Sequence, residues 1–218
     1  MADLQMVQPV TLETVQQYAI NSGMMCIDVD ITSCKSAEEL INLVNKEQGK
    51  WLGATSGTTD ISENRKSWSP DHNGLRMAWK GANWLESAQP SIKAKLVQMK
   101  PGNIKVSSGA ADIEGEDTDA IKIKPRTSYK DDDYHSVLWF TNYGTNALIC
   151  AYFKNALCVS GLKWTIDDKK VATCDVEFRA HADSPISTDY LPVEYYIFKS
   201  TAPDEPSEQS APDEPSEQ

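Results

Sequence analysis

The sequence is poor in the residue patterns that zinc sites and disulfide frameworks need. Its three histidines, His72, His135 and His181, have no neighbouring cysteine or histidine at the spacing of zinc ligands. The five cysteines form no Cys-x-x-Cys pair. Met1–Val10 lacks a charged start followed by an apolar run, so we predict no signal peptide. We therefore expect reduced thiols, most of them core fillers, in a protein made in the cytosol.

Familiar catalytic and membrane motifs are also missing. The sequence contains no Gly-x-Ser-x-Gly elbow, no His-Glu-x-x-His pair and no stretch that approaches the roughly 18 apolar residues of a membrane span. Trp51–Thr59 is rich in glycine, but neither a lysine nor a helical pattern follows it, which disfavours a phosphate loop. We predict that the chain is not an enzyme and uses no cofactor, although a triad assembled from distant residues stays open.

Acidic charge is concentrated at the C-terminal end. Ala202–Gln209 reads APDEPSEQ and Ala211–Gln218 repeats it, with three acids and no base in each copy. The formal net charge is −11, so the chain without these six acids carries −5. A mildly acidic body argues against a protein that grips the nucleic-acid backbone through a basic face. The proline and charge content of the repeat predicts a disordered tail over 201–218.

Alternation of apolar and polar residues dominates the body. The clearest case is Ala172–His181, which predicts a half-buried strand. Further candidates, separated by short turns or loops, are Met24–Ile31, Ile61–Ser69, Leu75–Lys80, Ile92–Met99, Ile121–Lys124, Tyr134–Thr141, Ala147–Phe153, Leu162–Ile166 and Leu191–Phe198. This pattern predicts a mainly β fold, an antiparallel β-sandwich or barrel. We expect the last two strands to pair and to close the core.

One flanking α-helix is expected after the first strand. Ser36 and Glu39 form a capping box, and an apolar stripe follows, made of Ala37, Leu40, Ile41 and Val44. Gly49 is a suitable stop. We predict one domain over residues 1–200, with an N-terminal arm over 1–22 that includes a short helix at Thr11–Tyr18 with Leu12 and Val15 on one face.

Ser107–Ala120 reads SSGAADIEGEDTDA and has almost no large apolar residue. Its composition predicts a long flexible loop, and Pro101-Gly102-Asn103 is expected to end the strand before it. Four carboxylates lie close together, but the EF-hand spacing is absent, so a calcium site is disfavoured. Such a loop is either a binding surface or disordered.

Six tryptophans are distributed along the chain: Trp51, Trp68, Trp79, Trp84, Trp139 and Trp164. Indole rings can line a sugar or peptide site, but in β proteins they more often fill the core or a subunit interface. We favour the core or an interface.

Three stretches resemble the major tail tube proteins of long-tailed bacteriophages, particularly those infecting Gram-positive hosts. The first is WLGATSGTTDIS (Trp51–Ser62). It is followed by a hairpin, which the Asn73-Gly74 turn predicts between Ile61–Ser69 and Leu75–Lys80, by Trp79-Lys80-Gly81 and by the strand Ile92–Met99. The second is Tyr134 with LWFTNYGTN (Leu138–Asn146) and FKNAL (Phe153–Leu157). The third is SGLKWTIDDKKVATCDVEFRAHAD with LPVEYYIF. Together they span most of Trp51–Phe198. The duplicated tail has no place in this pattern.

The resemblance implies a β-sandwich or barrel with one flanking helix that assembles into hexameric rings, which stack into a tube. It implies a place in the virion, with tape-measure, tail tip or baseplate and tail terminator proteins as partners, passage of double-stranded DNA, and no insertion into membranes. It supplies no catalytic residues. The 107–120 loop and the N-terminal arm are then candidates for inter-ring contacts, and the loop residues concerned are Ser108, Asp112, Ile113, Glu114, Glu116, Asp117 and Asp119.

Two other functions stay open. A β-sandwich module that binds carbohydrate or protein would use the tryptophans, but such surface or secreted modules usually carry a signal peptide and paired cysteines. A metal-dependent enzyme would use the acids of Glu114–Asp119. Binding of glycans by a stable monomer, or stabilisation by calcium or magnesium, would favour these alternatives.

Overall fold

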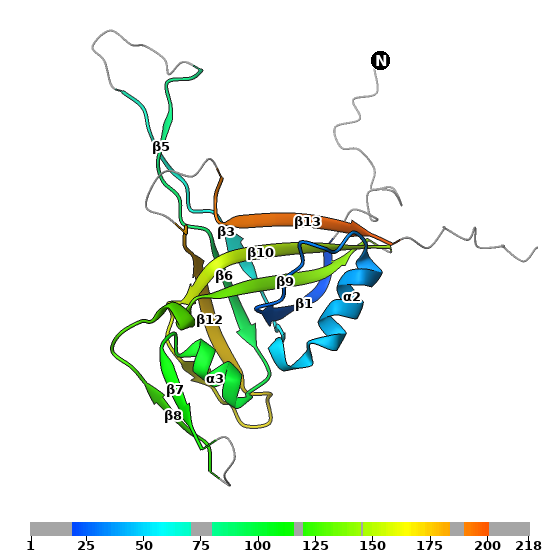
Figure 1. The fold of residues 1–218 in the computed structure, drawn as a ribbon, viewed down its shortest axis with the longest axis vertical. Helices are drawn as coiled ribbons and strands as arrows, with labels where there is room; N and C mark the ends of the chain where they lie inside the picture. The colour runs from blue at the N-terminus through cyan, green and yellow to red at the C-terminus, as the bar shows by residue number, and fades with distance from the viewer. Residues whose placement is uncertain (1–18, 71–79, 116–119, 145, 184–189, 201–218) are drawn as a thin grey trace, which may run out of the picture.

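An antiparallel β-barrel forms the centre of the molecule (Figure 1). The structure is a computed structural model that describes residues 19–70, 80–115, 120–144, 146–183 and 190–200. Its strands are β1 (Ala19–Ile27), β2 (Trp51–Ala54), β3 (Asp60–Ser62), β4 (Lys66–Trp68), β5 (Trp84–Ser87), β6 (Ser91–Leu96), β7 (Ala111–Glu114), β8 (Lys122–Pro125), β9 (His135–Tyr143), β10 (Ala147–Cys158), β11 (Lys163–Thr165), β12 (Thr173–Ala180) and β13 (Val193–Lys199). The described helices are α2 (Ala37–Lys46), α3 (Pro101–Ser107) and short 3-10 helices at Gln48–Lys50 and Asp131–Asp133. The predicted mainly β, antiparallel fold is confirmed, with a second α-helix besides the expected one.

Hydrogen bonds between strands far apart in the sequence close the barrel. Its strands follow one another in the order β2-β1-β9-β10-β12-β6. Just after β2, two neighbouring residues form hydrogen bonds with two different strands. The N–H of Thr55 donates to the Gly23 carbonyl of β1 at 2.9 Å, and the N–H of Ser56 donates to the Lys95 carbonyl of β6 at 2.8 Å. Thr55 also forms a bridge with Leu96. The two ends of the strand order therefore meet, and the sheet closes on itself.

One apolar core fills the barrel, and each of its strands contributes to it. Phe153 and Phe178 are among the largest fully buried side chains. The alternation predicted for Ala172–His181 is confirmed, because its apolar members line this core: Cys174, Val176, Phe178 and Ala180. The alternation in β6 is confirmed in the same way, with Ile92, Ala94 and Leu96 buried and Lys93 and Lys95 exposed.

Helix α2 packs on the outside of the barrel and creates a second apolar cluster. The predicted cap is present: the Ser36 hydroxyl accepts the N–H of Glu39 at 3.2 Å, although the Glu39 carboxylate accepts the N–H of Lys35 instead of that of Ser36. Ala37, Leu40 and Val44 are buried, but Ile41 is exposed, so its assignment to the stripe is wrong. One residue after Leu40, Ile41 is rotated by about 100° from the buried face.

Strand β10 belongs to two different strand pairs. Its first half, Ala147–Phe153, pairs with β13, and its last residues, Ala156–Cys158, pair with β12. A register shift separates the halves at Asn155, which has a positive φ of 45°. The expected pairing of the last two strands with each other is therefore wrong, because both pair with β10. Strand β10 also extends beyond Phe153, the predicted end of this strand, to Cys158.

Helix α3 and strand β7 form where the sequence predicts the end of a strand and a long loop, whereas β8 confirms the predicted strand Ile121–Lys124. Pro101 does not end a strand but begins α3 at the first helical turn, where a missing N–H costs nothing. Asn103 ties this helix to the barrel, because its side-chain amide donates to the Leu52 carbonyl at 2.6 Å. Ala111–Glu114 forms β7, paired with β8, so the prediction of a long flexible loop over 107–120 is wrong for the residues on either side of 116–119, which lie outside the described residues.

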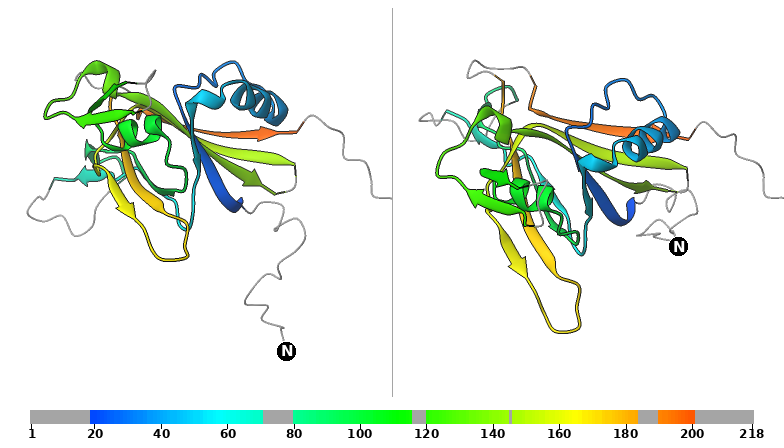
Figure 2. Two further views of the ribbon diagram at one scale, coloured as in Figure 1. Left: turned by 90° about the horizontal axis from the view of Figure 1, so that it is seen from below. Right: turned by 60° about the horizontal axis from the view of Figure 1, so that its bottom comes forward.

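Two hairpins extend from the barrel. The β4–β5 hairpin projects from one end (Figure 1), and the β11–β12 hairpin extends from another side (Figure 2). The described partner of β4 is Trp84–Ser87, and the predicted strand Leu75–Lys80 lies outside the described residues except for Lys80. Strand β1 begins at Ala19, so the last residues of the predicted arm 1–22 belong to the sheet. The Thr11–Tyr18 helix and the 201–218 tail fall outside the described residues.

Candidate assembly interface

The β4–β5 hairpin presents large apolar side chains to solvent. Trp68 and Trp84 face each other across its two strands, with ring centroids 5.6 Å apart and an interplanar angle of 33°. They are 55% and 54% exposed, and Leu85 beside them is 53% exposed. An ion pair between Lys66 and Glu86, 2.9 Å apart, joins the strands. An apolar patch held away from the core marks a surface for a partner.

The β11–β12 hairpin carries a second exposed apolar group. Trp164 lies on β11, and Ile166 and Val171 flank the turn at Asp167–Lys170. All three side chains are exposed. Both hairpins therefore present apolar side chains to solvent, although β12 itself continues into the barrel and contributes to its core.

A cleft of about 520 Å³ opens between the base of the β4–β5 hairpin and the start of β13. Leu85, Tyr190 and Tyr195 line it together with the charged side chains of Arg65 and Glu194. Tyr190 and Tyr195 are exposed. The cleft combines exposed aromatic rings with charges of both signs. Such a lining suits a peptide or sugar, and it equally suits contact with another subunit.

The β7–β8 hairpin holds the described residues of the predicted inter-ring contact. Ser108 caps α3 through a hydrogen bond to the Ile104 carbonyl at 2.8 Å. Asp112 and Glu114 are exposed on β7, with Ile113 half-buried between them. Glu114 pairs with Lys124 across the hairpin at 2.6 Å. Glu116, Asp117 and Asp119 lie outside the described residues, so the structure places only part of this set.

Arg126 fixes the base of this hairpin. Its guanidinium contacts Asp112 at 3.0 Å and Asp133 at 2.5 Å. The backbone N–H of Arg126 donates to the Ala110 carbonyl at 2.8 Å. Asp133 is buried, and its second oxygen accepts the N–H of Lys130 at 2.7 Å. Because bases neutralise the described acids, this region is an ordered, ion-paired hairpin and not a bare cluster of carboxylates.

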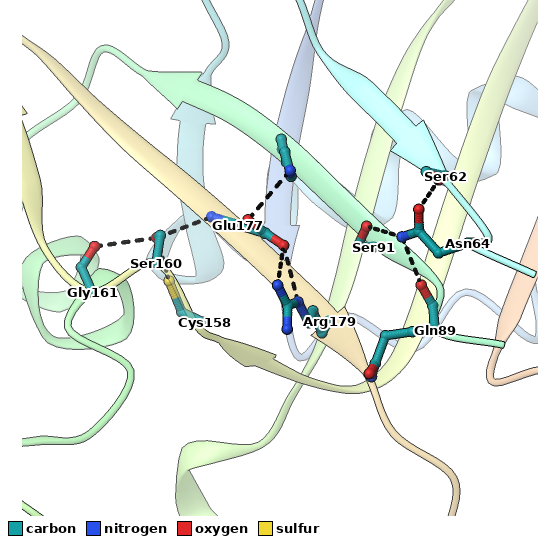
Figure 3. A network of polar contacts seen from close by, with 10 residues as sticks. Ser62, Asn64, Gln89, Ser91, Cys158, Ser160, Gly161, Glu177 and Arg179 are labelled. Atoms are coloured by element: carbon teal, nitrogen blue, oxygen red, sulfur yellow. Dashed lines mark hydrogen bonds and ion pairs between the residues drawn. The ribbon is translucent and has the colours of Figure 1, made fainter. Parts of the chain in front are cut away.

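A charged groove of about 540 Å³ crosses the outer face of β6 and β12. Glu177 contacts Arg179 at 2.9 Å and Lys93 at 3.5 Å, and its backbone N–H donates to the Ser160 hydroxyl at 3.1 Å (Figure 3). Asp175 lies beside Lys163 at 3.1 Å. Since its acids and bases alternate and pair, the groove has no strong attraction for phosphate.

Asn64 forms the other polar centre in Figure 3. Its side-chain amide donates to the Gln89 carbonyl and the Ser91 hydroxyl, both at 3.0 Å, and its oxygen accepts the Ser62 hydroxyl at 2.7 Å. Its φ is 45°, a conformation that asparagine tolerates better than most residues. These bonds fix the connection between β3 and β4 from which the projecting hairpin departs.

The two described histidines make structural contacts. His135 lies 2.7 Å from a carboxylate oxygen of Asp28, whose other oxygen accepts the N–H of Ser136 at 3.1 Å. Partial burial alone would raise the pKa of Asp28, but these contacts outweigh it and lower the pKa. His181 packs edge-on against Tyr134, with ring centroids 5.3 Å apart. His72 lies outside the described residues.

The tryptophans and thiols divide between core and surface. Trp51 and Trp139 are partly buried against the two cores, whereas Trp68, Trp84 and Trp164 are exposed; Trp79 is not among the described residues. The expected core position is confirmed in part for Trp51 and Trp139, and for the three exposed rings the alternative of a subunit interface stays a prediction. All five thiols are free, and four are buried, as expected: Cys26, Cys150, Cys158 and Cys174. Burial raises the pKa of Cys26 to about 12.

Comparison with known proteins does not identify the chain. No protein-family model matches the chain, and a search of curated proteins finds no match. Among the described residues, no group of three or more histidine, cysteine or acidic side chains could hold a metal ion, and no helix is long and apolar enough to cross a membrane. What function the chain has must be argued from its surfaces.

The exposed Trp68–Trp84 pair is the feature that sequence reasoning missed. The turn at Asn73-Gly74 predicts that Ile61–Ser69 pairs with the strand directly after the turn. That pairing would not bring Trp68 next to Trp84. The available signal was the composition of the two short strands, since Trp68 and Trp84 each have polar or charged neighbours and no long apolar run to place them in a core.

Proposed function

We propose that the chain is a structural subunit of a phage tail tube, which assembles into stacked hexameric rings around a conduit for DNA. The barrel with α2 on its outside fits the fold that the sequence resemblance implies. The observation that carries the proposal is the exposed apolar surface on the projecting hairpins, above all Trp68, Trp84 and Trp164. In a monomer about half of each of these side chains stays exposed to water, whereas a subunit can bury them against its neighbours.

Contacts around a ring need two different surfaces that fit head to tail. Strand β13 supplies one, because its only described strand partner is β10 and its outer edge can accept a neighbour's strand. The β4–β5 hairpin supplies the other as a projecting, aromatic element. The β7–β8 hairpin, with Ser108, Asp112, Ile113 and Glu114, is then the contact between successive rings, with the N-terminal arm as a further candidate.

The remaining partners follow from this role. A tube of this kind encloses a tape-measure protein, ends at a tail tip or baseplate and a terminator protein, and passes double-stranded DNA without reading its sequence. The mildly acidic body suits passage, because a basic lumen would bind phosphate. The place of the protein is then the virion, after synthesis in the host cytoplasm.

Electron microscopy of the full-length protein over a concentration series tests the proposal. We expect rings or hollow tubes, and we expect the double variant Trp68→Ser/Trp84→Ser to form neither while it remains folded. The matched control is Ile41→Ser, which also removes an exposed apolar side chain but lies on α2. Monomers at every concentration, or assemblies that persist without both tryptophans, would contradict the proposal.

A binding module for carbohydrate or protein is the second candidate, and the cleft beside Tyr190 and Tyr195 favours it. Aromatic rings beside paired charges suit stacking against a sugar. A glycan array probed with the monomer would support this function if binding were lost in Tyr190→Ala. In that case assembly at high concentration would be absent.

A further inference from the structure

The β4–β5 hairpin is the outer part of a longer two-stranded ribbon. In the inner part β3 pairs with β6, up to the pair of Ser62 and Ser91. In the outer part β4 pairs with β5, from the pair of Lys66 and Ser87 onward, and a short stretch on each side separates the two parts. The inner part belongs to the barrel sheet, whereas β4 and β5 form a sheet of their own. The direction of the outer part is therefore decided at the junction between the two parts.

Asn64 connects the two sides of the ribbon at this junction. Its φ of 45° departs from the extended backbone of a strand. Its side-chain amide donates to the Gln89 carbonyl and the Ser91 hydroxyl across the ribbon, and its oxygen accepts the Ser62 hydroxyl. One side chain thus contacts the end of β3, the connection after β5 and the start of β6 (Figure 3). Asparagine suits this position because it offers two donors and an acceptor and tolerates a positive φ.

The opposite side of the junction is fixed to the barrel. Pro90 is fully buried, and its carbonyl accepts the N–H of Ala180 at the end of β12 at 2.9 Å. Next to it, the N–H of Gln89 donates to the Glu63 carbonyl at 3.0 Å. The bonds of Asn64 therefore tie the chain that enters the hairpin to a part of the ribbon that cannot move without the barrel.

An open cleft borders the hairpin on the side of β13. The cleft of about 520 Å³ described above lies there, and Leu85 of β5 lines it. Trp68 lies four residues beyond Asn64, which is about 13 Å along an extended strand. A rotation of about 20° at Asn64 would therefore move Trp68 by about 4–5 Å, enough to break a packed contact with a neighbour.

We propose that Asn64 is a positioning residue, which sets the direction of the β4–β5 hairpin and so aligns Trp68 and Trp84 for contact with a neighbouring subunit. This role rests on the function proposed above. The indole pair supplies the contact surface, and the amide of Asn64 holds that surface in one direction. Loss of the amide bonds releases the hairpin and leaves the barrel folded.

The distance between two spin labels, one on the hairpin and one on the body, tests this role in the full-length protein. The labels are attached to Ser67→Cys on β4 and Ile41→Cys on α2, in a Cys34→Ser background that removes the half-exposed native thiol. We expect one narrow distance distribution when Asn64 is present. Asn64→Gly permits the same φ but removes all three bonds, so the distribution should shift or broaden by about 4–5 Å. An unchanged distribution would overturn the proposal.

Two further variants separate the amide bonds from the flexibility of glycine. Asn64→Asp tolerates the same φ and still accepts from Ser62, but at neutral pH it has no N–H to donate, so it should release the hairpin as well. Lys169→Gly is the matched control, because Lys169 also has a positive φ, 61°, but lies in the turn between β11 and β12. It should leave the distribution narrow. A narrow distribution in Asn64→Asp, or a broad one in Lys169→Gly, would contradict the role of the amide.

Electron microscopy of the same chains without labels connects this role to assembly. Where the parent chain forms rings or tubes, we expect Asn64→Gly and Asn64→Asp to form none while their circular dichroism spectra stay unchanged. Full assembly of both variants with a released hairpin would overturn the proposal and leave the proposed function intact. A parent chain that never assembles would instead contradict the proposed function, and the spin-label distances would still decide whether Asn64 directs the hairpin.

Discussion

Trp68 and Trp84 stack against each other on a hairpin that stands away from the barrel, with ring centroids 5.6 Å apart and about half of each side chain exposed. The contact stabilises the hairpin locally, but neither ring reaches the core clusters. The pair is therefore separate from the packing that stabilises the barrel, and it is the surface that the proposed assembly would bury.

The first prediction follows from this separation. Trp84→Ala should change the free energy of unfolding by no more than about 1 kcal/mol, because the lost ring contact is exposed. Phe178→Ala should cost about 3–5 kcal/mol, because Phe178 is fully buried in the barrel. Urea denaturation of both variants measures the difference. A large loss in Trp84→Ala would show that the hairpin is part of the cooperative fold.

Two glycines beside the predicted contact region should respond in opposite ways to alanine. Gly109 has a φ of +76°, and a Cβ there would collide with the carbonyl oxygen of Cys158, so Gly109→Ala should cost at least about 1–2 kcal/mol. Gly102 lies in α3 with open space around its Cα, so Gly102→Ala should stabilise by about 0.5–1 kcal/mol. Thermal unfolding of the two variants checks this, and equal effects would contradict the conformation at Gly109.

The Asp28–His135 contact makes stability depend on pH. Because the folded pKa of Asp28 is lowered, its contribution is present above the carboxyl pKa of the unfolded chain, about 3.9, and is lost as the pH falls through the folded value. Asp28→Asn should therefore be less stable than the parent at pH 5, by less than about 1 kcal/mol because the side chain is partly exposed. Urea titrations at pH 5 and below pH 3 measure this, and a difference that is unchanged at low pH would argue against it.

The thiols should react in an order set by burial. Burial raises the pKa of Cys26 and of Cys150 to about 12, so both should resist alkylation at pH 8 in the folded protein. Cys34 is half-exposed and should be modified first, although partial burial and the nearby carboxylates of Glu39 and Asp30 raise its pKa and slow it. Mass spectrometry should show one adduct on the native chain and five after unfolding. Rapid modification of several thiols would contradict the buried positions.

Local patterns in the sequence predict the elements whose structure depends on near neighbours. The Ser36 cap predicts α2, and strict alternation predicts β6 and β12, because a half-buried strand needs only its own period to show which face is apolar. Helix α3 is missed since Pro101 and Gly102 suggest a break, while proline is compatible with a first helical turn. Strand β8 is predicted as Ile121–Lys124, but its partner β7 is missed because ion pairs such as Asp112–Arg126 hold it and no apolar stripe marks it.

Long-range pairings leave no comparable signal. Nothing near Thr55 in the sequence indicates that it meets Leu96, and the closeness of β12 and β13 along the chain suggests a pairing that β10 prevents. The candidate interface depends on the same kind of pairing, since Trp68 and Trp84 meet only in the correct register. The sequence contains six tryptophans, but it does not show which of them lie outside the core.

The closed barrel has a consequence for how this protein can change over evolutionary time. Because the Thr55–Leu96 bridge connects the segment after β2 to β6, the barrel closes within one chain, and its core residues constrain one another through packing. The β4–β5 and β7–β8 hairpins form separate two-stranded sheets, and β11 pairs with β12 alone among the described strands. Substitutions of exposed side chains on these elements should therefore disturb folding less than substitutions in the barrel core, so these surfaces can vary while the barrel keeps its architecture.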